Sequence, residues 1–194
     1  MIQSVQMASP DTEYHALIDA GELTADADQA RAVAALERLH REMTDYAPAS
    51  NRERNLLFRW ISTLARSSEN GSDVPKGIYL YGGVGRGKSM LMDLFYSVAP
   101  IAAKQRIHFH EFMLDIHARL KERHELSAQK RAQHGGHAQD EDPIPFIAQQ
   151  IAHESTLLCF DELQVTDIAD AMVLARLFKE LFAQGVIIIA TSNR

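Results

Sequence analysis

The feature that most constrains this chain is a glycine-rich segment of eight residues, Gly82-Gly83-Val84-Gly85-Arg86-Gly87-Lys88-Ser89. It matches the phosphate-binding loop pattern at every fixed position. The residues Gly77–Tyr81 before it have the composition of a β-strand, and a helix is expected from Lys88 to about Ser97. Because a strand precedes the loop and a helix follows it, a chance glycine-rich turn is the weaker interpretation. The segment therefore predicts a P-loop nucleotide-binding fold.

This pattern assigns separate roles to the residues of the loop. Glycines let the backbone curl so that successive N–H groups point at phosphate oxygens, next to the positive end of the following helix. Lys88 is expected to reach the β- and γ-phosphates, where it assists catalysis, and the Ser89 hydroxyl is expected to ligate Mg²⁺. The Arg86 side chain is expected to be solvated. The predicted nucleotide-binding residues are Gly82, Gly83, Val84, Gly85, Arg86, Gly87, Lys88, Ser89 and Met90.

A second motif is the apolar run Leu157-Leu158-Cys159-Phe160 followed by Asp161 and Glu162. We expect Asp161 to hold Mg²⁺, through a water molecule, and Glu162 to orient and polarise the attacking water. Successive strand residues point to opposite sides, so the two acids are able to do different work beside one phosphate. An apolar run ending in two acids is a weak signal alone and a much stronger one after a complete phosphate loop.

Strands and helices alternate after the loop, which predicts an α/β fold with a parallel sheet covered by helices on both faces. Further strands are expected at Arg106–His110, Thr156–Phe160 and Val186–Ala190, with His108 and His110 facing the same side of the first of these. Ligands bind such sheets at the carboxyl ends of the strands. The glycine loop, the acidic pair and Thr191-Ser192-Asn193 should therefore converge. Asn193 is a candidate for positioning water or contacting the γ-phosphate, with a simple turn residue as the alternative.

The remaining segments define the predicted domain organisation. Glu13–Leu39 should form two helices broken near Gly21, and Ser50 with Glu53 forms a capping box before a helix with one apolar face. We therefore expect an N-terminal helical segment at residues 1–70 and an ATPase core at residues 71–194. Glu125–Asp142 is polar and contains two adjacent glycines, which predicts a flexible surface insertion.

Composition narrows the function classes. The net charge of −6 gives no general basic field for a nucleic-acid backbone, so no nucleic-acid partner is expected. No apolar run approaches the ~20 residues that span a bilayer, and the first ten residues lack the pattern of a signal peptide. Cys159 is the only cysteine and falls in an apolar strand, so we expect an inert core thiol. These features favour a reducing, cytoplasmic location.

The motifs resemble the AAA+ branch of P-loop ATPases, in which Asn193 takes the place of the "sensor 1" residue. Three segments are similar, more narrowly, to the ZapE cell-division ATPases and to their mitochondrial relatives, the Afg-type or lactation-elevated ATPases: Arg106-Ile-His-Phe-His-Glu-Phe-Met, Leu158-Cys-Phe-Asp-Glu-Leu-Gln-Val-Thr-Asp-Ile-Ala-Asp-Ala-Met and Ala190-Thr-Ser-Asn-Arg. The N-terminal segment Tyr14–Leu39 is similar too. The resemblance implies a protein partner, such as division-ring components at the bacterial inner membrane, a homo-oligomer, and peripheral rather than spanning contact with the membrane.

Members of that family continue beyond the position of Arg194 with another strand, an arginine finger and a helical lid, so this chain is expected to be the front portion of a longer protein. The leading hypothesis is a Mg²⁺-dependent ATPase with ATP and Mg²⁺ as ligands, poorly active as this chain stands. Two alternatives remain: a P-loop phosphotransferase, and a nucleotide-regulated binding module with negligible turnover.

Overall fold

The computed structural model describes residues 8–46, 74–133 and 142–193. After the first two helices, successive strands are separated by helices, with two consecutive helices between the second and third strands. The helices are α1 (Pro10–Asp19), α2 (Ala27–Thr44), α5 (Lys88–Val98), α6 (Phe109–Gln133), α7 (Pro143–Glu154) and α8 (Ile168–Ala183). The strands are β1 (Ile78–Gly82), β2 (Lys104–His108), β3 (Leu157–Asp161) and β4 (Ile187–Asn193).

The four strands form one parallel sheet in the order β1-β4-β3-β2. β4 is the last strand in the chain, yet it lies between β1 and β3, with Ile78 opposite Ile189 and Cys159 opposite Ile189 on the other side. Gly77 approaches β4 so closely that an added Cβ would meet the Ile188 carbonyl oxygen at 1.9 Å. The predicted parallel α/β architecture is therefore confirmed.

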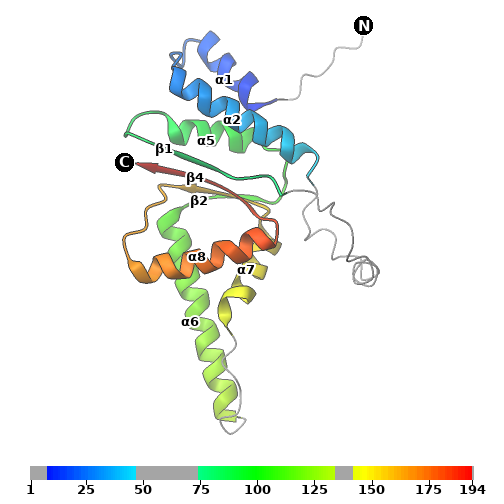
Figure 1. Ribbon diagram of the computed structural model, residues 1–194, viewed down its shortest axis with the longest axis vertical. Helices are drawn as coiled ribbons and strands as arrows, with labels where there is room; N and C mark the ends of the chain where they lie inside the picture. Colours follow the sequence, from blue (N-terminus) through cyan, green and yellow to red (C-terminus); the bar gives the residue numbers. More distant parts are fainter. Residues whose placement is uncertain (1–7, 47–73, 134–141, 194) are drawn as a thin grey trace.

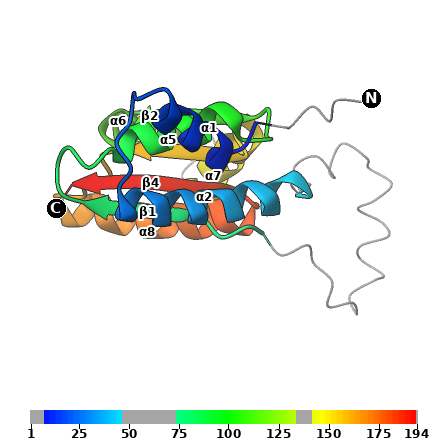
Figure 2. The ribbon, with the colours of Figure 1, turned by 90° about the horizontal axis from the view of Figure 1, so that it is seen from above.

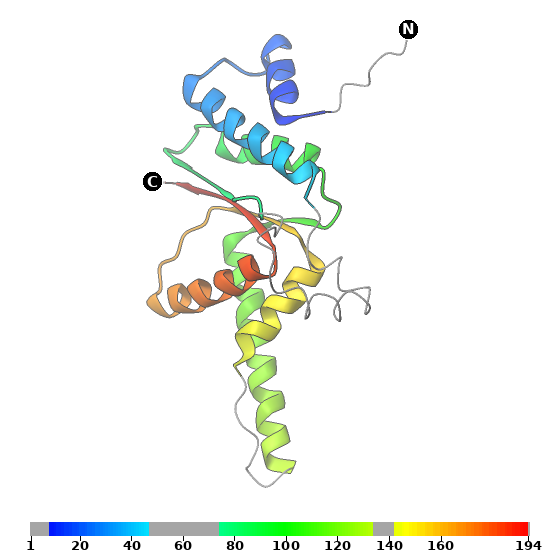
Figure 3. The same ribbon diagram turned by 45° about the vertical axis from the view of Figure 1, so that its right-hand side comes forward.

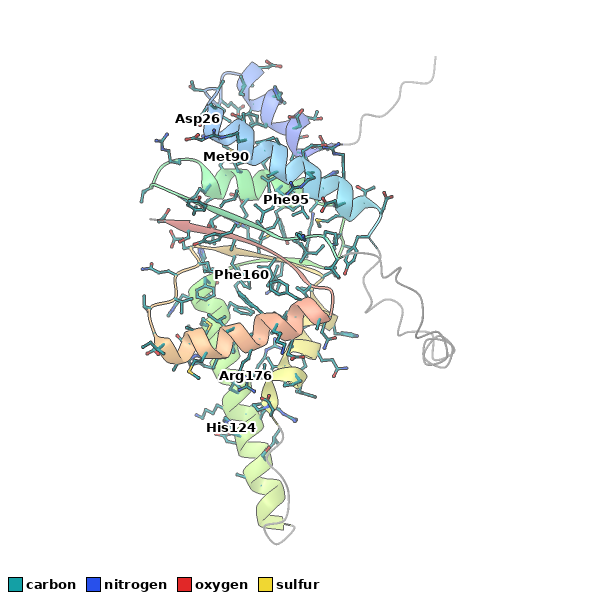
Figure 4. The ribbon with its side chains drawn as sticks, in the orientation of Figure 1. Asp26, Met90, Phe95, His124, Phe160 and Arg176 are labelled. Carbon is teal, nitrogen blue, oxygen red and sulfur yellow. The ribbon has the colours of Figure 1, made fainter. Side chains whose placement is uncertain are left out.

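Helices cover both faces of the sheet (Figure 1). Helices α1, α2 and α5 lie on one face, and α6, α7 and α8 lie on the other (Figure 1), while Figure 2 looks down onto the face that α2 covers. Each face has its own apolar core, and the side chains of Phe95 and Phe160 lie on opposite sides of the sheet (Figure 4). The strands are parallel, so their carboxyl ends meet at one edge, at the left in Figure 1.

The N-terminal helices are part of the core on the α5 face. As predicted, two helices are separated near Gly21, whose φ is 75°. The Asp26 side chain caps α2 by accepting from the backbone N–H groups of Asp28 and Gln29, at 2.8 and 3.0 Å. Tyr14 is buried in the same apolar cluster as the inward residues of α2, α5, β3 and β4. The predicted boundary near residue 70 lies outside the described residues, as do Ser50, Glu53 and the helix expected after them.

Two expectations about the segment after β2 are wrong. The strand ends at His108 and α6 begins at Phe109, so His110 lies on a helix and does not alternate with His108 along a strand. The helix then continues to Gln133, so the first half of the supposed insertion Glu125–Asp142 is helical. Figure 3 shows this half of α6 extending away from the sheet. Asp142 is also ordered by its role as the N-cap of α7, where it accepts from the Ile144 N–H at 3.1 Å.

Within the described residues, no helix combines the length and the apolar character that crossing a bilayer requires.

Candidate nucleotide-binding site

The glycine loop joins the end of β1 to the start of α5 at the carboxyl edge of the sheet (Figure 1). Gly85 and Gly87 have φ of 79° and 77°, a left-handed conformation that residues with a side chain adopt only under strain. Gly87 is the N-cap of α5 and provides no side-chain cap. The first amides of this helix are therefore available to an anion, as a phosphate-binding loop requires.

Lys88 bends back over the loop that precedes it. Its Nζ donates to the carbonyl oxygens of Gly82 and Gly83, at 3.0 and 2.8 Å. Val84, at the tip of the loop, is 82% exposed, whereas Met90 is partly buried against the α5-side core. The ammonium group thus lies over the curl of the backbone, where a bound phosphate chain would meet it.

Ser89 and Asp161, 72 positions apart in the chain, are joined by a hydrogen bond. The Ser89 Oγ donates to Asp161 Oδ1 at 3.1 Å, and the Thr191 hydroxyl donates to the same oxygen at 2.9 Å. The Asp161 residue is only 4% exposed. The two predicted metal-binding residues are therefore adjacent, and their donor atoms are the hard hydroxyl and carboxylate oxygens that Mg²⁺ prefers.

Glu162 turns the chain away from β3 in a conformation unusual for its residue type. Its φ is 56°, and among the described residues no other non-glycine residue has a positive φ. Its backbone N–H donates to the Thr191 hydroxyl at 3.1 Å, and the next N–H, of Leu163, donates to the Thr191 carbonyl at 2.7 Å. Left-handed non-glycine residues concentrate at functional sites, where the surroundings hold them in place. Asp161 and Glu162 border a cavity of about 530 Å³ whose lining includes His108, His110 and Asp170.

Asn193 lies at the end of β4, opposite Gly82 in the strand register. This position places it beside the first residue of the loop, and no contact of its side chain defines its role further. Thr191, two residues earlier on the same side of the strand, contacts both acidic residues. Sequence reasoning did not select it, although its alternation with Asn193 was visible.

The N-terminal helices contact the loop, which sequence reasoning also missed. Arg86 forms an ion pair with Asp26 at 3.8 Å, although its side chain is 65% exposed, close to the solvated position predicted. The N–H groups of Gln29 and Asp28, and secondarily the charge of Arg86, lower the pKa of the Asp26 carboxyl. Gln29 Nε2 donates to the Arg86 carbonyl at 3.3 Å. Figure 4 labels Asp26, the N-cap of α2, and Met90 of α5 on the same side of the sheet.

A cavity of about 350 Å³ continues from the loop toward these helices. It is lined by Asp26, by α2 residues that include Gln29 and Ala32, and by residues 79–81 of β1. The loop and α5 contribute Gly82, Gly83, Arg86, Lys88 and Leu91. The phosphate loop therefore opens into a pocket large enough to continue a ligand beyond its phosphates.

Solved structures of other proteins have a similar fold. A structure of DnaI has a TM-score of 0.50 at 15% identity, covering 90% of this chain and 71% of that one. AMPPCP-bound DnaA from Aquifex aeolicus has a TM-score of 0.51 at 12% identity, covering 97% and 42%. The parallel sheet, the loop and these neighbours define a P-loop ATPase fold.

The model of the AFG1-like ATPase family matches residues 8–194, so this chain belongs to that family of AAA+ P-loop ATPases. It is 40% identical over 212 residues to lactation elevated protein 1 homolog B of Danio rerio, covering 94% of this chain and 42% of the relative. It is 39% identical over 190 residues to the cell division protein ZapE of Escherichia coli (strain K12), covering 97% and 47%. The predicted family is confirmed, and the chain spans less than half the length of these two curated relatives.

Proposed function

We propose that this chain binds Mg-ATP and hydrolyses it, with Lys88, Ser89, Asp161, Glu162 and Asn193 as the working residues. The observation that carries the proposal is the hydrogen bond between Ser89 and Asp161, at 3.1 Å. It joins the helix that follows the phosphate loop to the strand that ends in the acidic pair. Family membership and the AMPPCP in the DnaA neighbour support nucleotide as the ligand.

Each residue has a definable task in this reaction. The loop amides and Lys88 bind the phosphate chain. The Ser89 hydroxyl donates a hydrogen bond to Asp161, which leaves a lone pair on the Ser89 Oγ to bind a metal. When bound, Mg²⁺ would neutralise charge on the phosphates and polarise them. Glu162 orients the attacking water and accepts hydrogen bonding from it. Asn193, at the same edge, is placed to steady the γ-phosphate or the water.

The cavity beside the loop supplies a place for the base. Gln29 Oε1 accepts from the Tyr14 hydroxyl at 3.5 Å, while Nε2 donates to the Arg86 carbonyl, so these two contacts favour one orientation of the amide. These two contacts leave one N–H of Gln29 Nε2 and one lone pair of Gln29 Oε1 for a ligand. A glutamine amide pairs with the N6 and N7 atoms of adenine in this donor–acceptor arrangement. We therefore infer adenine recognition by Gln29.

The work coupled to hydrolysis is proposed by relation to ZapE. One relative is named a cell division protein. By that relation, we propose that hydrolysis drives action on a protein partner, within a homo-oligomer. Division-ring components at the inner membrane are the partner class that this relation suggests. The acidic net charge gives no support to a nucleic-acid partner.

A single comparison separates hydrolysis from the two alternatives. Phosphate release is measured with Mg-ATP and no added acceptor, in the wild type and in Glu162→Gln, with nucleotide affinity measured in parallel. We expect release in the wild type, and normal affinity with at least about a hundredfold slower release in Glu162→Gln, because the amide no longer polarises water. A phosphotransferase would release phosphate only with an acceptor. A binding module would show equal, negligible release in both proteins.

A further inference from the structure

Arg106, on the edge strand β2, connects the acid that follows the apolar strand to the helix that follows the loop. Its Nη2 lies 2.5 Å from Asp161 Oδ2, and its Nη1 lies 2.6 Å from Asp93 Oδ1 on α5. Arg106 shares its side of the strand with Lys104, whose ammonium donates to carbonyls at the end of α5. The guanidinium therefore lies between two carboxylates on the α5 face of the sheet.

These contacts give both oxygens of the Asp161 carboxylate a hydrogen-bond donor. Oδ1 accepts from the hydroxyls of Ser89 and Thr191, and Oδ2 accepts from Arg106. Since Thr191 in turn accepts from the backbone N–H of Glu162, a continuous chain of hydrogen bonds runs from Arg106 to the residue proposed to orient water. A bridging arginine contact of this kind fixes orientation as well as charge.

The charge balance of this cluster has a consequence for metal binding. Asp93 and Asp161 hold one guanidinium between them, so two negative charges are opposed by one positive charge. Without Arg106, the two carboxylates and the Ser89 hydroxyl would form an oxygen-rich, doubly negative cluster of the kind that binds divalent cations. The positive charge of Arg106 cancels much of the attraction between these carboxylates and a divalent cation. The additional negative charge that the cation needs then has to come from the phosphates of a nucleotide.

We propose that Arg106 is a positioning residue that holds Asp161 in one orientation and makes divalent metal binding at Ser89 and Asp161 depend on nucleotide. This inference rests on the proposed function of the site. Arg106 contacts neither the loop nor a reacting atom; it acts through Asp161.

The test uses Mn²⁺ as a spectroscopic probe in the full chain, with electron paramagnetic resonance reporting free and bound metal. Binding is titrated with and without a non-hydrolysable ATP analogue in the wild type, Arg106→Met and Arg106→Lys. We expect the wild type to bind Mn²⁺ tightly only with the analogue. Arg106→Met should bind Mn²⁺ alone about tenfold more tightly than the wild type and show a coupling between metal and nucleotide reduced by about the same factor.

Two further variants separate positioning from a merely structural link between β2 and α5. Arg106→Lys retains the charge without the bridge, so it should keep metal binding dependent on nucleotide while lowering kcat. Asp93→Asn in the Arg106→Met background removes one carboxylate and should return nucleotide-free Mn²⁺ binding toward the wild-type level. Far-UV circular dichroism checks that each variant is folded; if Arg106→Met is not, Arg106→Gln takes its place.

Wild-type Mn²⁺ binding and coupling in folded Arg106→Met, or in Arg106→Gln where it takes its place, would overturn the proposal, and Arg106 would then serve only the fold. Failure of the proposed function looks different. In that case calorimetry would detect no nucleotide binding to the wild type or to any of the Arg106 variants.

Discussion

At the scale of single residues, Lys88 provides the most direct test of nucleotide binding. We predict that Lys88→Ala abolishes detectable Mg-ATP binding, because the ammonium over the loop is the cation that contacts the β- and γ-phosphates. Isothermal calorimetry on folded protein measures the affinity. The substitution also removes two hydrogen bonds to loop carbonyls, so thermal melting without nucleotide serves as the control. An affinity equal to the wild type would remove Lys88 from the site.

Gln29 tests the identity of the base. Gln29→Leu keeps the approximate size and loses the amide, so we predict that the preference for ATP over ITP falls by about tenfold, the value of one well-placed pair of hydrogen bonds. ITP replaces the N6 donor with an oxygen that opposes Gln29 Oε1. The 7-deaza analogue of ATP lacks the N7 acceptor. The wild type should therefore bind this analogue more weakly than it binds ATP, whereas Gln29→Leu should bind the two nucleotides equally well. An unchanged ATP:ITP ratio would contradict the assignment.

The sequence predicts the principal site residues because their patterns are local. The loop occupies eight consecutive positions, and the acidic pair follows an apolar strand directly. Their convergence follows from the carboxyl-end rule of parallel sheets. The contributions of Thr191, Arg106 and Gln29 depend on which strands and helices become neighbours. Pattern reasoning gave the strand ends but not the strand order or the docking of α2, so it could not assign these contacts.

At the scale of elements, the join between α6 and α7 is where prediction was least accurate. Polar composition suggested a loop from Glu125, yet polar residues such as glutamate, lysine and glutamine also favour helices, and α6 continues to Gln133. Gly135 and Gly136 have low helix propensity, but they come after the last residue of α6 in the sequence. Composition identifies a polar surface here without distinguishing a solvated helix from a loop.

Asp142 tests how firmly the start of α7 is held. Its carboxylate caps the Ile144 N–H and forms an ion pair with Arg176 of α8. We predict that Asp142→Ala lowers the free energy of unfolding by about 1 kcal/mol, the usual value of an N-cap, and that Asp142→Asn lowers it less because asparagine also caps. Urea denaturation measures both. Equal losses in the two variants would assign the effect to the ion pair, which is exposed and worth less.

At the scale of the whole molecule, Cys159 reports opening of the fold. The thiol is fully buried, and burial raises its pKa to about 12 from its ordinary value of 9.0. The thiolate is the reactive form, so at pH 8 alkylation of the native chain should require opening. The contribution of this raised pKa to the free energy of unfolding is fully present below pH 9, and it declines as the pH rises toward 12.

We therefore predict that saturating Mg-ATP slows alkylation of Cys159. A ligand at 100 times its Kd stabilises the native state by about 2.7 kcal/mol, which corresponds to roughly a hundredfold slower labelling through global opening. Lys88→Ala should show no such protection, and mass spectrometry after timed quenching measures the rates. Because the chain has one cysteine, the signal needs no assignment. Rapid labelling that ATP leaves unchanged in the wild type would contradict both the burial and the linkage.

The strand order has a consequence for how the chain is made. β1 carries the phosphate loop, and among the described strands it pairs with β4 alone, whose residues are synthesised roughly a hundred positions later. On the ribosome, the loop therefore emerges long before the strand that will hold its first residue in register. Contacts this distant in sequence are slow to form. We therefore expect the phosphate loop to acquire its binding geometry during synthesis only after β4 has been translated.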